Sequence, residues 1–323
     1  MSNRWLAVLG TAAVGLAAVA PAFLGDHLVH VLIQILLFAY LSSCWNILGG
    51  FTGQLSFGHA LFMAVGAYSS TLLLLHLGVS PWFGMFAGGF LAALLGLFIG
   101  YLSFRYGIKG TYFVLVTLAF TEVARIVALN TPAIGGALGL YITIQGDDFW
   151  QIKFVDKSRY YYVVLALLLI VLAVGAWLER SRTGHRLLAI RENEDAAQAL
   201  GINLLRYKLF ATALSALLTA LGGTFYAQYV TFIDPSTLLN MNMALEITIY
   251  SIVGGIGTLV GPLLGAAFLV PIAEWVRAAL GNHYAGIHLV VYGAVLMAVI
   301  RFAPDGLLGL IKNLQARFLG SKS

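Results

Sequence analysis

Charged residues make up only 10% of this 323-residue sequence. A soluble globular domain carries roughly 25% charged residues, so the composition excludes that class. Apolar residues make up 60% of the chain, and its mean hydropathy is +0.91. Runs of about 20 mainly apolar residues recur, each long enough to cross a hydrocarbon core of roughly 30 Å. The sequence therefore predicts an all-α, polytopic membrane helical bundle, and unbroken runs of this length exclude an outer-membrane β-barrel.

Cysteine and the common catalytic motifs are also scarce. The one cysteine, Cys44, excludes a disulfide framework. The sequence has neither a Gly-x-x-x-x-Gly-Lys-Ser/Thr phosphate loop nor a His-Glu-x-x-His motif. The seven histidines are dispersed, and no set of acidic or cysteine partners completes a metal site beside His27 and His30. We therefore expect a protein that is not an enzyme, does not hydrolyse ATP by the phosphate-loop route, and holds no metal or cofactor.

Ten apolar runs predict ten membrane spans that form a single transmembrane domain over residues 1–323. Their predicted limits are 5–24, 28–48, 55–77, 82–103, 110–130, 160–178, 208–230, 238–256, 262–281 and 286–303. The first run has features of a cleavable signal peptide, but Pro21 would directly follow the cleavage site, so we interpret it as the first helix. Two connections are long, residues 131–159 and 179–207.

Lysine and arginine are sorted between the two sides of this topology. Thirteen fall on the side of the termini and three, Lys153, Lys157 and Arg159, on the other, with Arg125 and Arg277 inside spans. By the positive-inside rule, this distribution predicts that both termini and loop 179–207 are cytoplasmic and that loop 131–159 is external. The net charge of +5 thus reports membrane topology, and we expect no nucleic-acid partner.

The segment from Glu179 to Lys208 holds ten of the chain's 31 charged residues. Such a stretch cannot lie in lipid, so it contacts water or a soluble partner. Asn193 is a good helix N-cap, and the acids Glu194 and Asp195 suit the positive end of a helix. The residues that follow are helix formers as far as Gly201, a suitable stop. We expect a helix of about two turns that either is simply solvated or fits a groove on another protein.

Two glycine-rich breaks each join two predicted spans on the cytoplasmic side. They are residues 49–59, with the sequence GGFTGQLSFGH, and residues 254–262, with the sequence GGIGTLVGP. Paired interruptions in the two halves of a transporter indicate a pathway at a repeat interface, although two tight turns would give the same pattern. The pathway candidates in these breaks are Gly53, Gln54, Ser56, Gly58, His59, Gly254, Gly255 and Gly257.

Ionisable residues inside spans are costly in lipid, and each is therefore a candidate for function. Glu122 and Arg125 lie three residues apart on one predicted helix, so they either neutralise each other or form a polar wall of a translocation cavity. Glu274 and Arg277 repeat this spacing, and Glu246 has no partner on its own helix. These few charges do not form the chain of carboxylates expected of a proton relay.

Several segments resemble the branched-chain amino-acid permease family of ATP-binding-cassette importers, in particular its M-type subunit. The segment Asp195-Ala196-Ala197-x-x-x-Gly201 resembles the Glu-Ala-Ala-x-x-x-Gly coupling motif, with Asp in place of Glu. The string at 189–203, the string at 53–68 and the tail at 301–309 are similar to the same family. One departure is that nothing after Gly201 reproduces the Ile-x-Leu-Pro of the wider importer motif.

The resemblance implies a division of labour in the inner membrane of a bacterium. Two homologous permeases form the pore, two cytoplasmic ATP-binding subunits drive alternating access, and an extracytoplasmic binding protein delivers the solute. It implies that ATPase coupling involves Arg191, Glu192, Asn193, Glu194, Asp195, Ala196, Ala197, Leu200 and Gly201.

Two points stay open at this stage. A secondary transporter or channel that works alone would share the same composition, whereas an intramembrane enzyme is disfavoured by the missing catalytic residues. The resemblance implies branched-chain amino acids as substrates, but relatives of the family carry other amino acids, urea, amides or aromatic acids. No side chain in the sequence decides among them.

Overall fold

The computed structural model describes residues 20–143, 146–280, 290, 293–295, 297–298, 301 and 306–310, with Ala22 and residues 277–280 as backbone only. Two of the ten predicted spans, 5–24 and 286–303, lie largely outside the described residues, as do both termini. Each of the other eight falls on a helix. These helices are α2 (Asp26–Thr52), α3 (His59–Leu77), α4 (Pro81–Arg105), α5 (Thr111–Leu129), α6 (Lys157–Arg180), α9 (Leu204–Val230), α11 (Met241–Gly255) and α12 (Gly261–Leu280).

The first six of these helices are long and apolar enough to cross a membrane, so the chain is a multi-pass membrane protein. The other two are shorter in their apolar length: α11 has 15 residues, and the apolar part of α12 is Gly261–Val276. The short elements are the 3₁₀ helices η1 (Ala20–Ala22), η2 (Pro132–Ile134) and η3 (Gly136–Leu138), and the helices α7 (Arg182–Glu192), α8 (Glu194–Ala199) and α10 (Pro235–Leu238).

The described part of the chain is not purely helical. Strand β1 (Leu140–Tyr141) pairs antiparallel with β2 (Phe232–Ile233), with Leu140 opposite Ile233. This small sheet ties the long connection after α5 to the end of α9. The described part of the chain is thus mostly helical, as the sequence predicts, with one two-residue ladder in addition.

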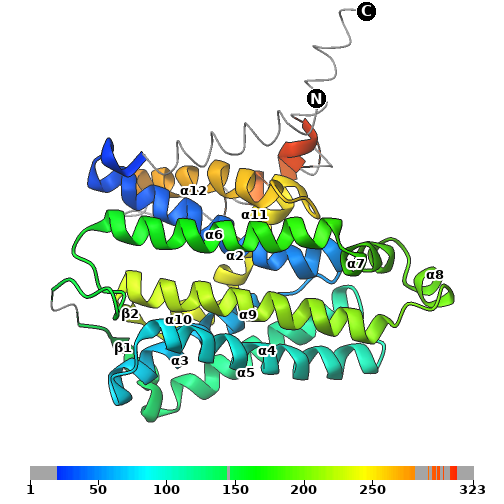
Figure 1. The fold of residues 1–323 in the computed structure, drawn as a ribbon, viewed down its shortest axis with the longest axis horizontal. Coiled ribbons are helices and arrows are strands. Elements are labelled where there is room, and N and C mark those ends of the chain that lie inside the picture. The colour runs from blue at the N-terminus through cyan, green and yellow to red at the C-terminus, as the bar shows by residue number, and fades with distance from the viewer. Residues whose placement is uncertain are drawn as a thin grey trace, which may run out of the picture.

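The long helices run roughly along one axis, so the molecule has two ends (Figure 1). The first is the α8 end, which we define by α7, α8 and the ends of α4, α6 and α9 that adjoin them. The second is the β end, with β1, β2 and α10. Lys153, Lys157 and Arg159 belong to the β end, whereas Arg105 and Lys109 belong to the α8 end, together with the charged segment. The cations are thus sorted between the two ends as the sequence predicts.

Helix α9 packs against α3 and α4, and α2 packs against α6, α9, α11 and α12. The contact between α3 and α9 brings the two backbones together. A Cβ atom on Gly66 would lie 2.0 Å from the carbonyl oxygen of Ala220, and one on Gly223 would lie 2.0 Å from that of Met63. Small residues permit this approach, which favours helix association in lipid, where no hydrophobic driving force acts between helices.

Candidate coupling site and translocation residues

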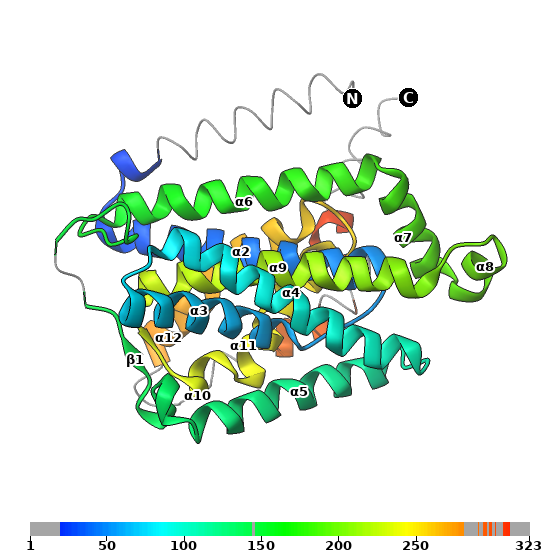
Figure 2. The ribbon, with the colours of Figure 1, turned by 60° about the horizontal axis from the view of Figure 1, so that its bottom comes forward.

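The charged segment folds as two helices at the α8 end, and α8 lies at the extremity of the molecule (Figure 2). The Asn193 side chain accepts a hydrogen bond of 3.0 Å from the backbone N–H of Ala196, which confirms the predicted N-cap. Gly201, with φ of +82°, follows the helix where the sequence predicts its stop. The segment Arg182–Glu192 forms a second helix in addition to the predicted one. This helix is α7, which is capped by Ser181.

Most of the predicted coupling residues are exposed. They are Glu192, Asn193, Asp195, Ala196, Leu200 and Gly201, and the side chain of Leu200 is 81% exposed. On α8 itself, Ala197 is buried against the rest of the chain and Glu194 is only partly exposed. An exposed surface of alanines with one large apolar residue and adjacent acids can dock against another protein.

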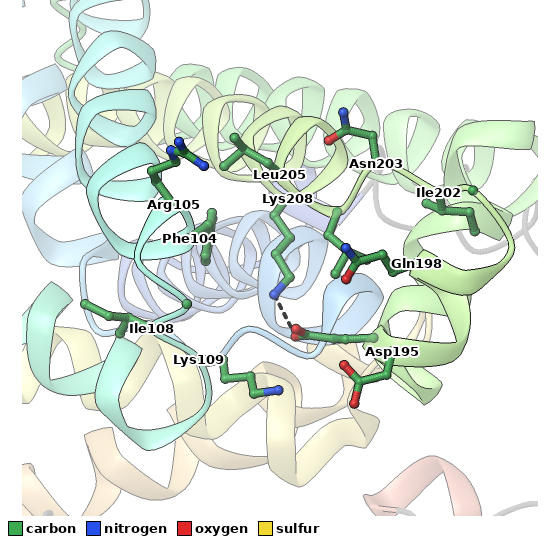
Figure 3. Close-up of a pocket in the computed structure, with 14 residues that line it drawn as sticks. Phe104, Arg105, Ile108, Lys109, Asp195, Gln198, Ile202, Asn203, Leu205 and Lys208 are labelled. Carbon is green, nitrogen blue, oxygen red and sulfur yellow. Dashed lines mark hydrogen bonds and ion pairs between the residues drawn. The ribbon is translucent and has the colours of Figure 1, made fainter.

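Glu194 instead faces the chain's own helices. Its carboxylate accepts a hydrogen bond of 3.0 Å from Nε2 of Gln54 and lies 2.6 Å from Nζ of Lys208. The Lys208 side chain is only 5% exposed, and its Nζ lies 5.2 Å from the centre of the Phe104 ring. This ion pair fastens the N-terminus of α8 to α9 (Figure 3). The hydrogen bond from Gln54 fastens it to the segment between α2 and α3.

A cavity of about 600 Å³ lies beside this ion pair, between α8 and the α4–α5 connection. Arg105 and Lys109 line it from the α4–α5 side, and Asp195 and Gln198 line it from α8 (Figure 3). The cavity thus separates α8 from part of the α4–α5 connection.

Arg191, at the end of α7, reaches into the first glycine break. Its Nη1 donates a hydrogen bond of 2.8 Å to the backbone carbonyl of Gly50. A Cβ atom on Gly257 would lie 1.9 Å from the same Nη1, and one on Gly53 would lie 3.3 Å from Cγ of Arg191. The arginine therefore lies between the two breaks, in a space that the glycines leave open.

The second break is also held by Asn46, which lies on α2 just before the first break. Nδ2 of Asn46 donates to the carbonyl of Thr258 at 2.9 Å, and Oδ1 of Asn46 accepts from the N–H of Gly257 at 2.8 Å. Gly306, in the C-terminal tail, packs against Gly255. Arg191, the two glycine breaks and Gly306 of the C-terminal tail thus meet at one place near the α8 end.

The other pathway candidates in the two breaks are packed inside the protein. Ser56 and Gly58 are buried, and fully buried His59 forms a hydrogen bond of 2.7 Å with Oγ of Ser215. Gly254 packs against the backbone of Gly261 in the tight α11–α12 turn. The lining of a pathway by these residues stays a prediction.

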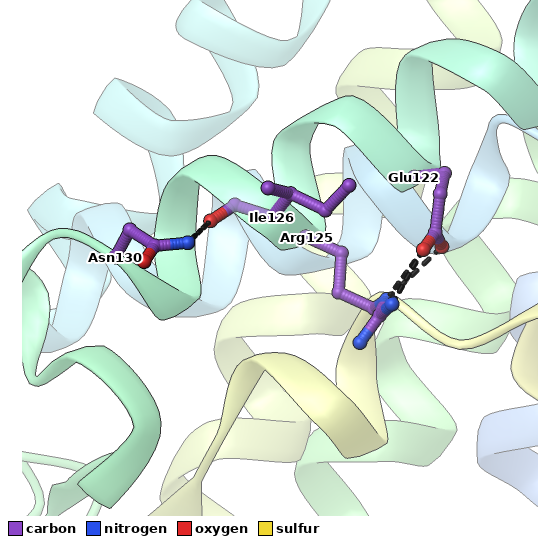
Figure 4. Close-up of polar contacts among 4 residues, drawn as sticks. All are labelled: Glu122, Arg125, Ile126 and Asn130. Atoms are coloured by element: carbon purple, nitrogen blue, oxygen red, sulfur yellow. Dashed lines mark hydrogen bonds and ion pairs between the residues drawn. The ribbon is translucent and has the colours of Figure 1, made fainter.

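Glu122 and Arg125 form the ion pair that their spacing predicts, with Nε of Arg125 3.0 Å from Oε2 of Glu122 (Figure 4). Their side chains are 50% and 31% exposed. Most of the apolar stretch of α5 is exposed, whereas most of the apolar stretch of α9 is buried inside the protein. The pair thus lies on the surface of a weakly packed spanning helix, where lipid contact would be costly.

Glu246 is 5% exposed and lines a cavity of about 400 Å³ at the β end. For the other predicted pair, Glu274 belongs to α12, but the side chain of Arg277 lies outside the described residues. No group of three or more metal-ligating side chains comes together in the part of the chain that the structure describes.

Sequence reasoning missed two residues of the coupling site. The sequence pattern groups Lys208 with the other cations of the charged segment, although it is the buried partner of Glu194. The pattern does not single out Asn46, although this side chain links α2 to the second break. The sequence signal that could identify Asn46 is an asparagine within an apolar run, shortly before the pair Gly49-Gly50.

Comparisons with known proteins agree with this architecture. The sequence profile described as "Branched-chain amino acid transport system / permease component" matches residues 27–300. The high-affinity branched-chain amino acid transport system permease protein LivM of Escherichia coli (strain K12) is 29% identical over 316 residues, which cover 91% of this chain and 72% of that protein.

Two further relatives match over shorter stretches. The autoinducer 2 import system permease protein LsrC of Klebsiella pneumoniae is 32% identical over 170 residues, 46% of this chain and 48% of that protein. A probable ABC transporter permease protein, y4mJ, of Sinorhizobium fredii is 31% identical over 199 residues, 58% of this chain and 57% of that protein. No solved structure gives a significant match. Because the family profile matches most of its length, the chain belongs to the family of branched-chain amino acid transport system permease components.

Proposed function

We propose that this chain is the permease subunit of an ATP-driven importer that carries branched-chain or related amino acids across the inner membrane of a bacterium. The chain has ten spans, and both termini and the α8 end are cytoplasmic. The sequence lacks a phosphate loop, so a separate pair of ATP-binding subunits supplies the energy. The names of the relatives support both parts of the proposal, transport of branched-chain amino acids and import.

One observation carries this proposal: α8 presents an exposed surface and is fastened to the membrane helices by Glu194 and Arg191. A partner that pushes α8 would displace α9 through the Glu194–Lys208 pair. It would displace both glycine breaks through Arg191. Contacts of this kind can convert closure of the ATP-binding subunits into tilting of the spans, which is the movement that alternating access requires.

In this proposal, the second permease and the external solute-binding protein contact surfaces other than α8. A second, homologous permease covers the face of α5 that carries Glu122 and Arg125, either directly or across a shared aqueous pathway, because lipid would not tolerate these charges. An external solute-binding protein docks at the β end. The predicted coupling and pathway residues act between these two surfaces.

The docking role is tested by the double variant Asp195→Lys with Leu200→Asp, which changes the exposed surface and leaves Glu194 in place. We expect both copurification of the ATP-binding subunits and uptake of L-leucine to be lost. The matched control is Glu179→Lys, a charge inversion at an exposed residue near the end of α6. Unchanged copurification and uptake in the double variant would remove the docking role.

A further inference from the structure

The cavity around Glu246 lies at the β end, far from the coupling site. It is formed by the first half of α2, the last turn of α9, α10 and the first turns of α11. Its volume of about 400 Å³ falls in the range of about 300–1,000 Å³ that is typical of sites for small molecules.

The lining of the cavity includes polar side chains that carry both kinds of hydrogen-bonding group. Glu246 supplies a carboxylate that is 5% exposed. His30 forms hydrogen bonds with the hydroxyl of Tyr229 and with Nε2 of Gln34, which joins α2 to α9 at the cavity. Asn240 caps α11 through its Oδ1 and also supplies an amide N–H₂ group.

Apolar side chains complete the lining. Leu37 is buried, Phe38 packs edge-on against Tyr250, and Met243 is partly buried. A methionine adapts its shape to branched apolar groups more readily than a rigid side chain does. The cavity thus places an anion and several amide donors next to an apolar surface.

We propose that this cavity binds a zwitterionic α-amino acid with an apolar side chain. The carboxylate of Glu246 receives the ammonium group, because a buried carboxylate attracts a cation strongly in a low-dielectric site. The amide donors of Gln34 and Asn240 receive the substrate carboxylate. The first turn of α11 adds a partial positive charge near that group. Leu37, Phe38 and Met243 contact the hydrocarbon side chain.

This inference rests on the proposed function, because it treats the β end as the side that receives solute. It goes further in that it assigns a binding site to one permease chain. That chain then contributes to selectivity after the solute has left its delivery protein. A carboxylate alone would accept any amine, and apolar contacts alone would accept any fatty acid. The combination requires both charged groups of the solute.

The test uses the assembled transporter in nanodiscs without nucleotide. Ser236 is exposed and lines the cavity, so Ser236→Cys provides a reporter for labelling with a maleimide. Cys44 is fully buried, so the chain's natural thiol adds little background. We expect L-leucine at ten times its Kd to slow labelling at position 236 about tenfold. Neither 4-methylpentanoate nor 3-methylbutylamine should protect, because each lacks one charge.

Two further measurements separate binding at this cavity from other effects. Leu138→Cys provides a matched reporter, exposed at the same end but outside the cavity, and L-leucine should leave its labelling rate unchanged. Glu246→Gln in the Ser236→Cys background should abolish protection, and Glu246→Asp should keep part of it. The comparison of the three solutes needs no change at Glu246, so it holds even where these variants fold poorly.

Equal protection by 4-methylpentanoate, or no protection by L-leucine, would overturn the proposal. The assay involves no ATP hydrolysis. Protection without ATP-dependent uptake would therefore contradict the proposed function alone. Uptake without protection would contradict this site alone.

Discussion

At the residue scale, Arg191 is the side chain that joins the coupling helices to both glycine breaks. It donates to the carbonyl of Gly50 and fills the space beside Gly257. The docking surface on α8 does not include this inward side chain. The proposed docking and the proposed transmission of movement therefore involve different residues, and variants can separate them.

We expect Arg191→Met to reduce uptake about tenfold or more, since a hydrogen bond from a charged group contributes about 1.5–3 kcal/mol. Copurification of the ATP-binding subunits should persist, because the exposed surface of α8 is unchanged. Arg191→Lys should restore part of the uptake, since lysine keeps the charge but not the planar guanidinium. The measurements are uptake in vesicles and subunit yield after purification.

Arg182→Met serves as the matched control, because Arg182 is an exposed arginine at the start of the same helix. This control should leave both uptake and the yield of copurified ATP-binding subunits near the values of the original protein. A result in which Arg191→Met loses the ATP-binding subunits would assign this side chain to docking instead.

The Glu194–Lys208 pair should contribute to stability because Lys208 is buried. Removal of one partner leaves the other ion poorly solvated, and we expect Lys208→Met to lower the free energy of unfolding by about 2 kcal/mol. In a double-mutant cycle with Glu194→Gln, the coupling free energy should be about 1–2 kcal/mol. Reversible denaturation of the purified chain in mixed micelles measures these values.

Arg206→Met offers a control for this cycle, since Arg206 is exposed in the same turn of α9. Its effect should add to that of Glu194→Gln without coupling. Additive effects of Lys208→Met and Glu194→Gln would argue that the observed ion pair does not stabilise the fold.

At the element scale, the spanning helices could be predicted from the sequence because each is a long apolar run. The cap at Asn193 could be predicted too, because it depends on neighbouring residues only. The course of α2 could not. Gly49 and Gly50 suggest a break, yet the helix continues to Thr52. These glycines leave room for the side chains of Trp45 and Asn46, and the turn begins only at Gly53, with φ of +70°.

The candidate site could be predicted only in part, for the same physical reason. The exposed residues of α8 follow from local helix chemistry. The inward orientation of Glu194 depends on Lys208, 14 residues away, and that of Arg191 depends on Gly50, 141 residues away. Contacts at such separations leave no periodic pattern in one sequence.

The α3–α9 contact gives a prediction about packing. Gly66→Ala would place a methyl group against the backbone of Ala220, which cannot move aside locally, and should destabilise the protein by about 1–3 kcal/mol. Gly89→Ala is the matched change on α4, where the nearest atom would lie 3.4 Å away, in ordinary contact. It should be neutral or stabilise by about 0.5–1 kcal/mol through reduced backbone entropy.

The melting temperature of each purified variant distinguishes these outcomes. Equal melting temperatures for Gly66→Ala and Gly89→Ala would show that α3 and α9 can separate without cost. In that case the close backbone contact would not be a constraint on the bundle.

At the scale of the whole molecule, the two ends have separate roles in the proposed transport cycle. The α8 end holds the coupling residues, and the β end holds the cavity around Glu246. Helices α2, α9 and α11 extend from one region to the other. In the proposed cycle, movement of these helices at the α8 end would change the walls of the cavity and would so connect ATP-driven closure to solute release.

This arrangement requires that the two ends face opposite sides of the membrane. Leu138 at the β end is 86% exposed, and Leu200 at the α8 end is 81% exposed, so a cysteine at either position can react. In intact spheroplasts, we expect a membrane-impermeant maleimide to label Leu138→Cys from outside. Leu200→Cys should react only after permeabilisation, and faster when the ATP-binding subunits are not expressed, because docking covers α8. Labelling of Leu200→Cys in sealed spheroplasts would place the coupling helix outside the cell, where no ATP-binding subunit could reach it.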